Sequence, residues 1–451
     1  MRAATIITKQ LALFLVVIVG SASMCFYWNR VNDAITRSRA SSSILRPKVL
    51  TDLYPSWYAA RELLLHHRDP YGAEVNRELQ IAYYGKQLDP TRPEEQQDQQ
   101  RFVYPLYFLV FVAPTAWMRF HTAQIIFWWV LAACAALAVL LWLRFLRLRL
   151  SLAALAILFV LVLSSIPVLQ NLSVLQPFLL PACFIAGAAA AIVSGRLFLA
   201  GALLAVATVK PQICLLPMAW FALWLCSDWK HRRSLFWGFA VTLGGLVLTS
   251  EWVLPAWLMR YPDVLRAYAE YTKTTSLLGR LLPSPLHWLL TILALATVAN
   301  LCWRARRQMA DSVPFAIALS SVLALTVLII PAVVQPLNHV LLLPAVLLVI
   351  RHWRELRQGS FVTRVATSMF CLCVFLPWLL AVVTVGNPLA PSRDWFLKVW
   401  PLPLAASMIL PFAVFGMLTL LWKVVAKQST SPHAVSGPSQ PTSLAVAKEQ
   451  A

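Results

Sequence analysis

Long apolar runs separated by short polar segments make up most of the chain. Such runs predict membrane-spanning helices, because about 20 apolar residues rising 1.5 Å each cross a hydrocarbon core of about 30 Å. The run 197–226 is too long for one helix, and Lys210-Pro211 divides it into two pieces. The run 103–118 is short and contains Pro105 and Pro114, which predicts either a re-entrant segment or a span. The runs are 10–28, 103–118, 123–143, 151–168, 172–194, 197–226, 235–258, 286–303, 313–331, 337–350, 362–385 and 398–424.

These runs predict an all-α polytopic membrane protein with about 11 to 13 spans. The composition agrees: 60% of the 451 residues are hydrophobic, only 12% are charged, and the mean hydropathy is +0.70. An ordinary soluble enzyme and a disordered chain are thereby excluded. The eight cysteines lie in or beside apolar runs and form no Cys-x-x-Cys pair, so they predict neither a disulfide framework nor a zinc site.

The net charge of +20 would suggest a nucleic-acid partner in a soluble protein. In a membrane protein, Lys and Arg collect in cytoplasmic loops instead. The basic clusters can all be cytoplasmic if 197–226 crosses twice and 103–118 does not cross fully. The N-terminus is then inside and residues 29–101 emerge outside. The clusters are Arg144/Arg147/Arg149, Lys230/Arg232/Arg233, Arg304/Arg306/Arg307 and Arg351/Arg354/Arg357.

The two ends of the chain require separate interpretations. Ser21-Ala22-Ser23 loosely resembles a signal-peptide cleavage site, but the run continues apolar through Trp28, which favours an uncleaved anchor. Residues 426–451 are polar and rich in Ser and Pro, which predicts a disordered tail. We therefore expect one transmembrane domain, residues 1–425, followed by that tail.

The acidic residues concentrate in the first outer loop. Ten of the 18 Asp and Glu residues fall within 29–101, together with 11 Lys and Arg, so the loop is nearly neutral. We expect a folded polar layer on the membrane with interfacial amphipathic helices, the first starting at Pro55. The Gln- and Glu-rich stretch within 86–101 predicts a mobile loop.

Asp52 comes just before that first helix, and two roles fit its position. Thr51 or Asp52 fits the N-cap position of the helix, a role worth about 1 kcal/mol. Alternatively, the carboxylate is a general base at the membrane surface. The two roles compete only in part, because a capping oxygen keeps free lone pairs.

Several short motifs, in this order, resemble glycosyltransferase family 87, a group of polyprenyl-phosphate-mannose-dependent enzymes in the GT-C superfamily. Each motif is weak alone, and their order and spacing carry the resemblance. They are Asp52-Leu53-Tyr54 with Tyr58-Ala59-Ala60-Arg61, Asp69-Pro70-Tyr71, Tyr104-Pro105-Leu106-Tyr107 with Ala113-Pro114, Gln170-Asn171-Leu172-Ser173, Ala200-Gly201-Ala202 leading to Lys210-Pro211, and Asn338-His339.

The resemblance implies a GT-C-like helix bundle that transfers a hexose, mannose in this family, from polyprenyl phosphate with inversion. The donor and a lipid or glycan acceptor are the implied partners, with membrane lipids around the bundle and no nucleic acid. The implied location is the cytoplasmic membrane, with the active site on the outer face. Asp52 matches the residue that serves the family as catalytic base.

Three basic residues are candidates for the donor phosphate. His339 matches the histidine with which a family segment enters the membrane. Lys210 lies between two apolar half-segments, where an ionisable side chain is expensive and therefore suggests function. Arg61 lies beyond Asp52 on the same predicted helix. Structural roles remain open for all three: a satisfied interfacial histidine, a snorkelling lysine and a headgroup-binding arginine.

Aromatic residues near these candidates can line a sugar site, although interfacial anchoring explains them almost as well. They are Tyr54, Trp57, Tyr58 and Tyr104. Asp52 has no second acid at short spacing, so we expect chemistry without a cofactor, with a divalent metal left open. His66 and His67 do not face one site on a helix, and we interpret them as interfacial.

Two other functions remain as alternatives. A secondary transporter has paired broken helices in two similar halves; this chain has one break, at Lys210-Pro211, without a counterpart. A polymerase or ligase of lipid-linked glycans is expected to carry its largest outer loop nearer the C-terminal half. The early, acid-rich loop favours the glycosyltransferase.

Overall fold

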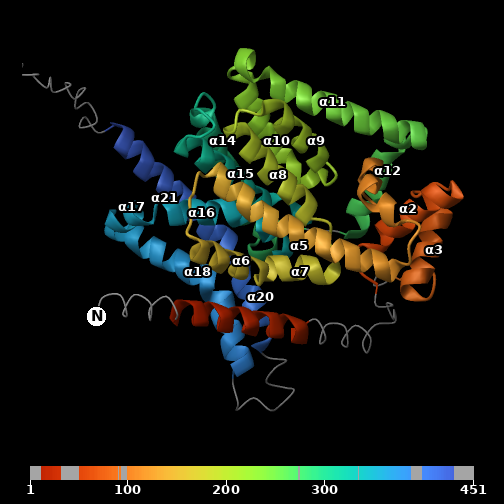
Figure 1. Ribbon diagram of the computed structural model, residues 1–451, viewed down its shortest axis with the longest axis horizontal. Coiled ribbons are helices and arrows are strands. Elements are labelled where there is room, and N and C mark those ends of the chain that lie inside the picture. Colours follow the sequence, from red (N-terminus) through yellow and green to blue (C-terminus); the bar gives the residue numbers. More distant parts are fainter. Residues whose placement is uncertain are drawn as a thin grey trace, which may run out of the picture.

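The structure is a computed structural model that describes residues 12–31, 50–89, 91–92, 99–272, 275–333, 335–386 and 399–430. In these ranges all regular secondary structure is helical (Figure 1), which confirms the predicted all-α membrane bundle. The proposed tail lies outside the described residues from 431 onward. Helix α21 continues to Thr430, so the last helix extends beyond the predicted boundary at 425.

Among the described residues, six segments are long and apolar enough to cross a membrane, and a bent pair adds a seventh, so the full-length spans found there are fewer than the 11 to 13 predicted. The bent pair, α6 and α7, turns by 54° between Leu163 and Ile166, within one predicted run. The six are Ala12–Val31, α5 (Phe120–Phe145), α11 (Trp229–Val253), α14 (Leu286–Ala305), α18 (Phe361–Gly386) and α20 (Pro401–Ser407) with α21 (Leu410–Thr430); the bent pair is α6 (Leu152–Leu163) with α7 (Ile166–Val174).

The other apolar runs form shorter helices. The 11 residues of α9 rise only about 16 Å, roughly half of the hydrocarbon thickness. The run 197–226 breaks at Lys210-Pro211 into α9 and α10, as predicted. The breaks between short helices bring buried polar side chains into the bundle, among them Lys210 and His339. The short helices are α8 (Leu179–Val193), α9 (Leu197–Ala207), α10 (Pro211–Cys226), α15 (Val313–Ile329), and η3 (Pro331–Val333) and η4 (Pro336–Leu342) leading into α16 (Leu343–Arg351).

The four basic clusters meet at one end of the bundle. Arg351 donates to the carbonyl of Leu146 at 2.6 Å, and Arg147 pairs with Asp311 at 3.0 Å. Arg232 donates to the carbonyl of Arg306 at 3.0 Å. These contacts place all four clusters on a common side, as the predicted topology requires.

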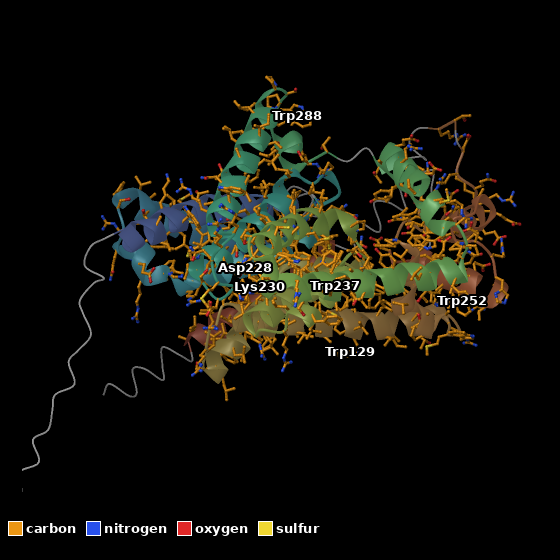
Figure 2. The ribbon with its side chains drawn as sticks, turned by 90° about the horizontal axis from the view of Figure 1, so that it is seen from above. Trp129, Asp228, Lys230, Trp237, Trp252 and Trp288 are labelled. Atoms are coloured by element: carbon orange, nitrogen blue, oxygen red, sulfur yellow. The ribbon has the colours of Figure 1, made fainter. Side chains whose placement is uncertain are left out.

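The opposite end carries a polar layer made of α2 (Tyr54–His66), α3 (Ala73–Tyr84) and α12 (Trp257–Thr272) (Figure 1). Helices α5 and α11 run the length of the bundle and reach this layer. Figure 2 shows Asp228 and Lys230 at one end of α11 and Trp252 at the other. We call these two ends the basic end and the polar layer.

The segment 103–118 enters and leaves the bundle at the polar layer. It folds as η1 (Leu106–Phe108), α4 (Leu109–Val112) and η2 (Ala113–Thr115). The Tyr71 hydroxyl donates to the carbonyl of Tyr104 at 2.7 Å, and the Trp57 indole donates to the carbonyl of Thr115 at 3.0 Å. Both ends of the segment are thus held by the same layer, and the re-entrant alternative is the one that the structure supports.

The helix Ala12–Val31 passes through Ser21-Ala22-Ser23 without a break. The Ser164 hydroxyl donates to the Ser21 hydroxyl at 2.9 Å, and Met24 and Tyr27 are buried against Ile166. This helix is packed into the bundle, which favours the uncleaved anchor over a signal peptide.

Two glycines bring α9 close to α11. A Cβ added at Gly201 would lie 2.0 Å from the carbonyl oxygen of Leu235, and one at Gly238 would lie 2.0 Å from that of Phe198. Small residues allow this backbone approach in membrane bundles. The crossing anchors α9, whose C-terminal end leads to Lys210.

Candidate active site

Asp52 lies at the entry to α2, where the polar layer meets the bundle. Its backbone N–H donates to the carbonyl of Val174, the last residue of α7, at 2.9 Å. One of its carboxylate oxygens accepts a bond of 3.2 Å from the side-chain amide of Gln176. The side chain is partly exposed, so an acceptor hydroxyl can reach it.

The capping interpretation is wrong. Helix α2 starts at Tyr54, one residue before the predicted start, and its N-cap residue is Leu53, with no side-chain hydrogen bond at the cap. The carboxylate of Asp52 turns instead toward Gln176, which is 124 residues away in sequence. With the N-cap role excluded, the general-base hypothesis is the remaining interpretation of Asp52.

Gln176 connects Asp52 to Tyr104. The Tyr104 hydroxyl donates to the side-chain oxygen of Gln176 at 2.9 Å, so the NH₂ group of the same amide faces Asp52. Burial, and then the negative charge of Asp52, raises the pKa of Tyr104 well above its usual range. Tyr104 therefore stays a hydrogen-bond donor that orients the amide.

Gln176 was not among the residues predicted from the sequence. It lies just after Leu175, whose left-handed backbone (φ 51°) ends α7, and before Pro177. A polar residue followed by proline inside an apolar run was the available signal, since both interrupt a span.

Lys210 lies at the break between α9 and α10 and is only 7% exposed. Its ammonium is 4.9 Å from the centre of the Phe178 ring, a cation–π contact. Among the described residues it forms no ion pair within 4 Å, but its charge interacts with that of Asp52. Because Phe178 lies two residues after Gln176, which contacts Asp52, the cation and the carboxylate lie against the same short segment. A buried cation that forms no ion pair with the described residues is a suitable contact for an anionic ligand.

The other two basic candidates make their described contacts with other residues. The Arg61 guanidinium donates to the carbonyl of Ala116 at 3.3 Å and stacks over Trp57 at 5.6 Å, which ties α2 to the re-entrant segment. His339 lies in η4, is 3% exposed and lies beside the backbone of Ser407. Neither of its ring nitrogens has a hydrogen bond of good geometry within the described ranges. No hydrogen bond given by the structure joins either residue to Asp52.

Three of the four aromatic candidates pack the polar layer. The Tyr54 ring is 4.9 Å from that of Phe120, and the Tyr58 hydroxyl donates to Glu78 at 2.8 Å. The Trp57 indole is bound to the re-entrant segment. Tyr104 alone of the four belongs to the hydrogen-bonded chain that ends at Asp52, so it is the best supported as a lining residue.

The positions of Gln176 and Asp52 predict a specific pH effect. Gln176→Glu places a second carboxylate against Asp52, and two adjacent carboxylates hold a shared proton more tightly. We expect the acid limb of the pH–rate profile for sugar transfer to move up by about one unit or more. Gln176→Leu, which removes the hydrogen bond to the carboxylate without adding charge, should lower kcat and move the acid limb up by less. An unchanged profile in both variants would exclude contact between Gln176 and the base.

The comparisons with known proteins identify the family. The model of glycosyltransferase family 87 matches residues 102–331, about half of the chain. No curated protein and no solved structure matches the chain. The matched part contains Tyr104, Gln176 and Lys210, whereas Asp52 and His339 lie outside it.

The match gives no support to the transporter alternative, because the family is one of sugar-transferring enzymes. It also agrees with the polytopic helical fold and with a buried polar group at the mouth of the bundle. The chain belongs to glycosyltransferase family 87 and is a glycosyltransferase of the membrane.

Proposed function

We propose that the protein transfers mannose from polyprenyl phosphate to a lipid or glycan acceptor outside the cytoplasmic membrane, with Asp52 as general base. The observation that carries the proposal is that a carboxylate, Asp52, and a buried cation, Lys210, contact the same short segment, Asp52 through Gln176 and Lys210 through Phe178. Inverting transfer from a lipid phosphate needs these two groups.

The distribution of Lys and Arg supports an active site on the outer face of the membrane. Lys and Arg mark cytoplasmic segments, and four basic clusters gather at the end opposite the polar layer. The polar layer and Asp52 then face outward. A donor on that face must be carried by a lipid, because nucleotide sugars are made inside the cell.

The burial of Lys210 supports a lipid-linked donor. Lys210 follows α9 inside the bundle and is only 7% exposed. A polyprenyl phosphate keeps its chain among the lipids and can bring its phosphate to a cation inside a membrane bundle. A GT-C-like architecture, in which the active site lies under a first outer loop, has the same arrangement.

The reaction follows from these positions. Asp52 takes the proton of an acceptor hydroxyl while its oxygen forms a bond to C1 of the sugar. The bond between C1 and the phosphate oxygen breaks, and its electron pair leaves with polyprenyl phosphate. Attack on the face opposite the leaving group inverts C1. Lys210 stabilises the charge on the departing phosphate, while Tyr104 and Gln176 orient Asp52.

Purified full-length protein in nanodiscs tests the donor. Radiolabelled polyprenyl-phosphate mannose, polyprenyl-phosphate glucose and GDP-mannose are each supplied with an extract of membrane lipids and glycans as acceptor. We expect label to move from polyprenyl-phosphate mannose, and not from GDP-mannose, into the acceptor fraction with inverted anomeric configuration. Direct transfer from GDP-mannose, or preference for the glucose donor, would overturn the proposal.

A further inference from the structure

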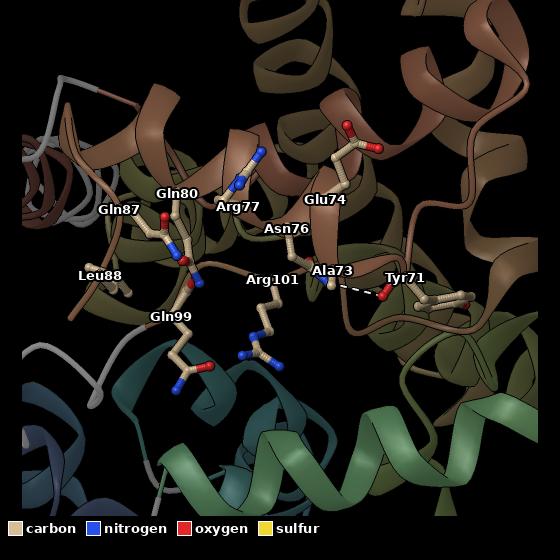
Figure 3. A pocket seen from close by; sticks show the side chains of 10 residues that line it. All are labelled: Tyr71, Ala73, Glu74, Asn76, Arg77, Gln80, Gln87, Leu88, Gln99 and Arg101. Carbon is tan, nitrogen blue, oxygen red and sulfur yellow. Dashed lines mark hydrogen bonds between the residues drawn. The ribbon is translucent and has the colours of Figure 1, made fainter. Parts of the chain in front are cut away.

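A polar pocket of about 670 Å³ opens in the polar layer (Figure 3), and Lys210 is not among the residues that line it. Its walls come from α3, which contributes Asn76, Arg77 and Gln80, and from the segment that returns toward the bundle, which contributes Gln99 and Arg101. The volume falls within the range of small-molecule sites.

Two buried polar atoms in this pocket have no hydrogen-bond partner in the described part of the chain: Nε of Arg101 and Oδ1 of Asn76. The amide NH₂ of Asn76 already donates to the carbonyl of Tyr71 at 3.0 Å, the bond drawn in Figure 3, which fixes the amide so that its oxygen remains to accept. An unsatisfied buried polar group costs about 1–3 kcal/mol. A hydrogen-bonding ligand would recover that cost.

Arg101 is held in place by an aromatic ring. Its guanidinium carbon is 5.9 Å from the centre of the Tyr271 ring of α12. Figure 3 shows that the Arg101 and Gln99 side chains extend side by side in the same direction. A guanidinium packed on a ring through its face keeps its edge for planar, bidentate contact with an anion.

The lining selects the chemical class of the ligand. Amide side chains both donate and accept, which suits the hydroxyl groups of sugars. Arg77 and Arg101 outnumber the one acid of the lining, Glu74, and Glu74 lies 3.5 Å from Arg68. The excess positive charge favours an anionic ligand.

The pocket is linked to the candidate active site through two tyrosines. Tyr71 lines the pocket, and its hydroxyl donates to the backbone carbonyl of Tyr104 at 2.7 Å. The Tyr104 side chain reaches Gln176, which contacts Asp52. Three hydrogen bonds therefore connect a residue of the pocket wall to the candidate base.

We propose that this pocket binds the sugar part of an acceptor that carries a negative charge, a phosphorylated or carboxylated glycan, and presents its hydroxyl to Asp52. The role as acceptor site rests on the proposed function, whereas binding of the anionic sugar does not. The pocket lies in the polar layer rather than in the membrane, so it takes the hydrophilic part of the acceptor.

Binding of mannose 6-phosphate to purified full-length protein in nanodiscs, measured by isothermal titration calorimetry, tests the pocket. We expect Arg101→Gln to weaken binding by about tenfold or more, because a charge-assisted hydrogen bond is lost. Asn76→Asp, which adds a negative charge, should weaken it similarly. The matched control is Arg266→Gln, since Arg266 is exposed on α12 and pairs only with Asp263 among the contacts that the structure gives; it should bind as wild type does.

Inorganic phosphate and mannose are the comparison probes. Both should bind at least several-fold more weakly than mannose 6-phosphate. If inorganic phosphate bound as tightly as mannose 6-phosphate, the pocket would be an anion site without sugar recognition. If all variants bound mannose 6-phosphate as wild type does, the pocket would not be its binding site.

The Asp52→Asn variant separates the two proposals. It should lose sugar transfer and keep the binding of mannose 6-phosphate. If no lipid-linked sugar is a donor but binding still depends on Arg101, the proposed function fails and the pocket remains. If transfer occurs and binding is insensitive to Arg101, the pocket fails alone.

Discussion

Asp52→Asn is expected to lower the rate of sugar transfer by about 10² to 10⁴-fold, the range that a general base contributes. Asparagine keeps the size of the side chain and an oxygen that can accept the bond from Gln176, so the local fold should survive. What it loses is the ability to take a proton from the acceptor hydroxyl. The measurement is initial transfer from radiolabelled polyprenyl-phosphate mannose in nanodiscs at saturating donor.

The control for this prediction is Asp263→Asn. Asp263 is an exposed carboxylate on α12 in the same polar layer, paired with Arg266 at 2.8 Å. We expect its rate to stay within twofold of wild type. If Asp52→Asn transferred sugar as fast as this control, Asp52 would not be the general base. Its role would then be structural, as a link between α2 and α7.

Two features of the sequence pointed to Asp52, an acid-rich outer loop and a position just before a helix, and the structure supports only the first. The concentration of acids in one outer loop directed attention to it, and the polar layer that this predicted is present. The local rule that a carboxylate before a helix is a cap failed, because α2 starts after Leu53 and the contact of Asp52 is with Gln176. A contact across 124 positions has no signature in local spacing.

The span count shows a second limit of sequence patterns. Apolar runs mark what is buried in membrane or bundle, but they do not tell a full crossing from a short helix that ends at a polar site. Helices α8 and α9 are as apolar as α5, yet they are shorter than the bilayer. The bend between α6 and α7 lies inside one run, where Ser164-Ser165 and Pro167 mark it.

The basic candidates show what patterns can and cannot assign. Lys210 was predicted because an ionisable side chain in an apolar run is energetically costly. In the structure, its charge interacts with that of Asp52. Arg61 was placed by helical spacing, and it contacts Ala116 and Trp57 instead. His339 rested on resemblance alone, and its role in holding phosphate stays a prediction.

Lys210→Met is expected to change activity and stability in opposite directions. Methionine has nearly the same length and fits a buried position, but it cannot donate to a phosphate. Loss of a charge-assisted contact worth about 1.5–3 kcal/mol should lower kcat/KM for the lipid donor by about 10- to 100-fold. The melting temperature should stay equal or rise, because an ammonium that is 7% exposed and lacks a direct ion pair costs desolvation energy.

This opposition separates a phosphate contact from a structural lysine. A lysine that held α9 and α10 in place would lose stability and activity together, whereas a group retained for function against its own burial cost would lose only activity. Lys230→Met, at an exposed lysine of the basic end, is the matched control and should change neither quantity. A lowered melting temperature for Lys210→Met with unchanged kcat/KM for the donor would contradict the assignment. The predicted result would show that Lys210 is retained for its contact with the donor phosphate and not for stability.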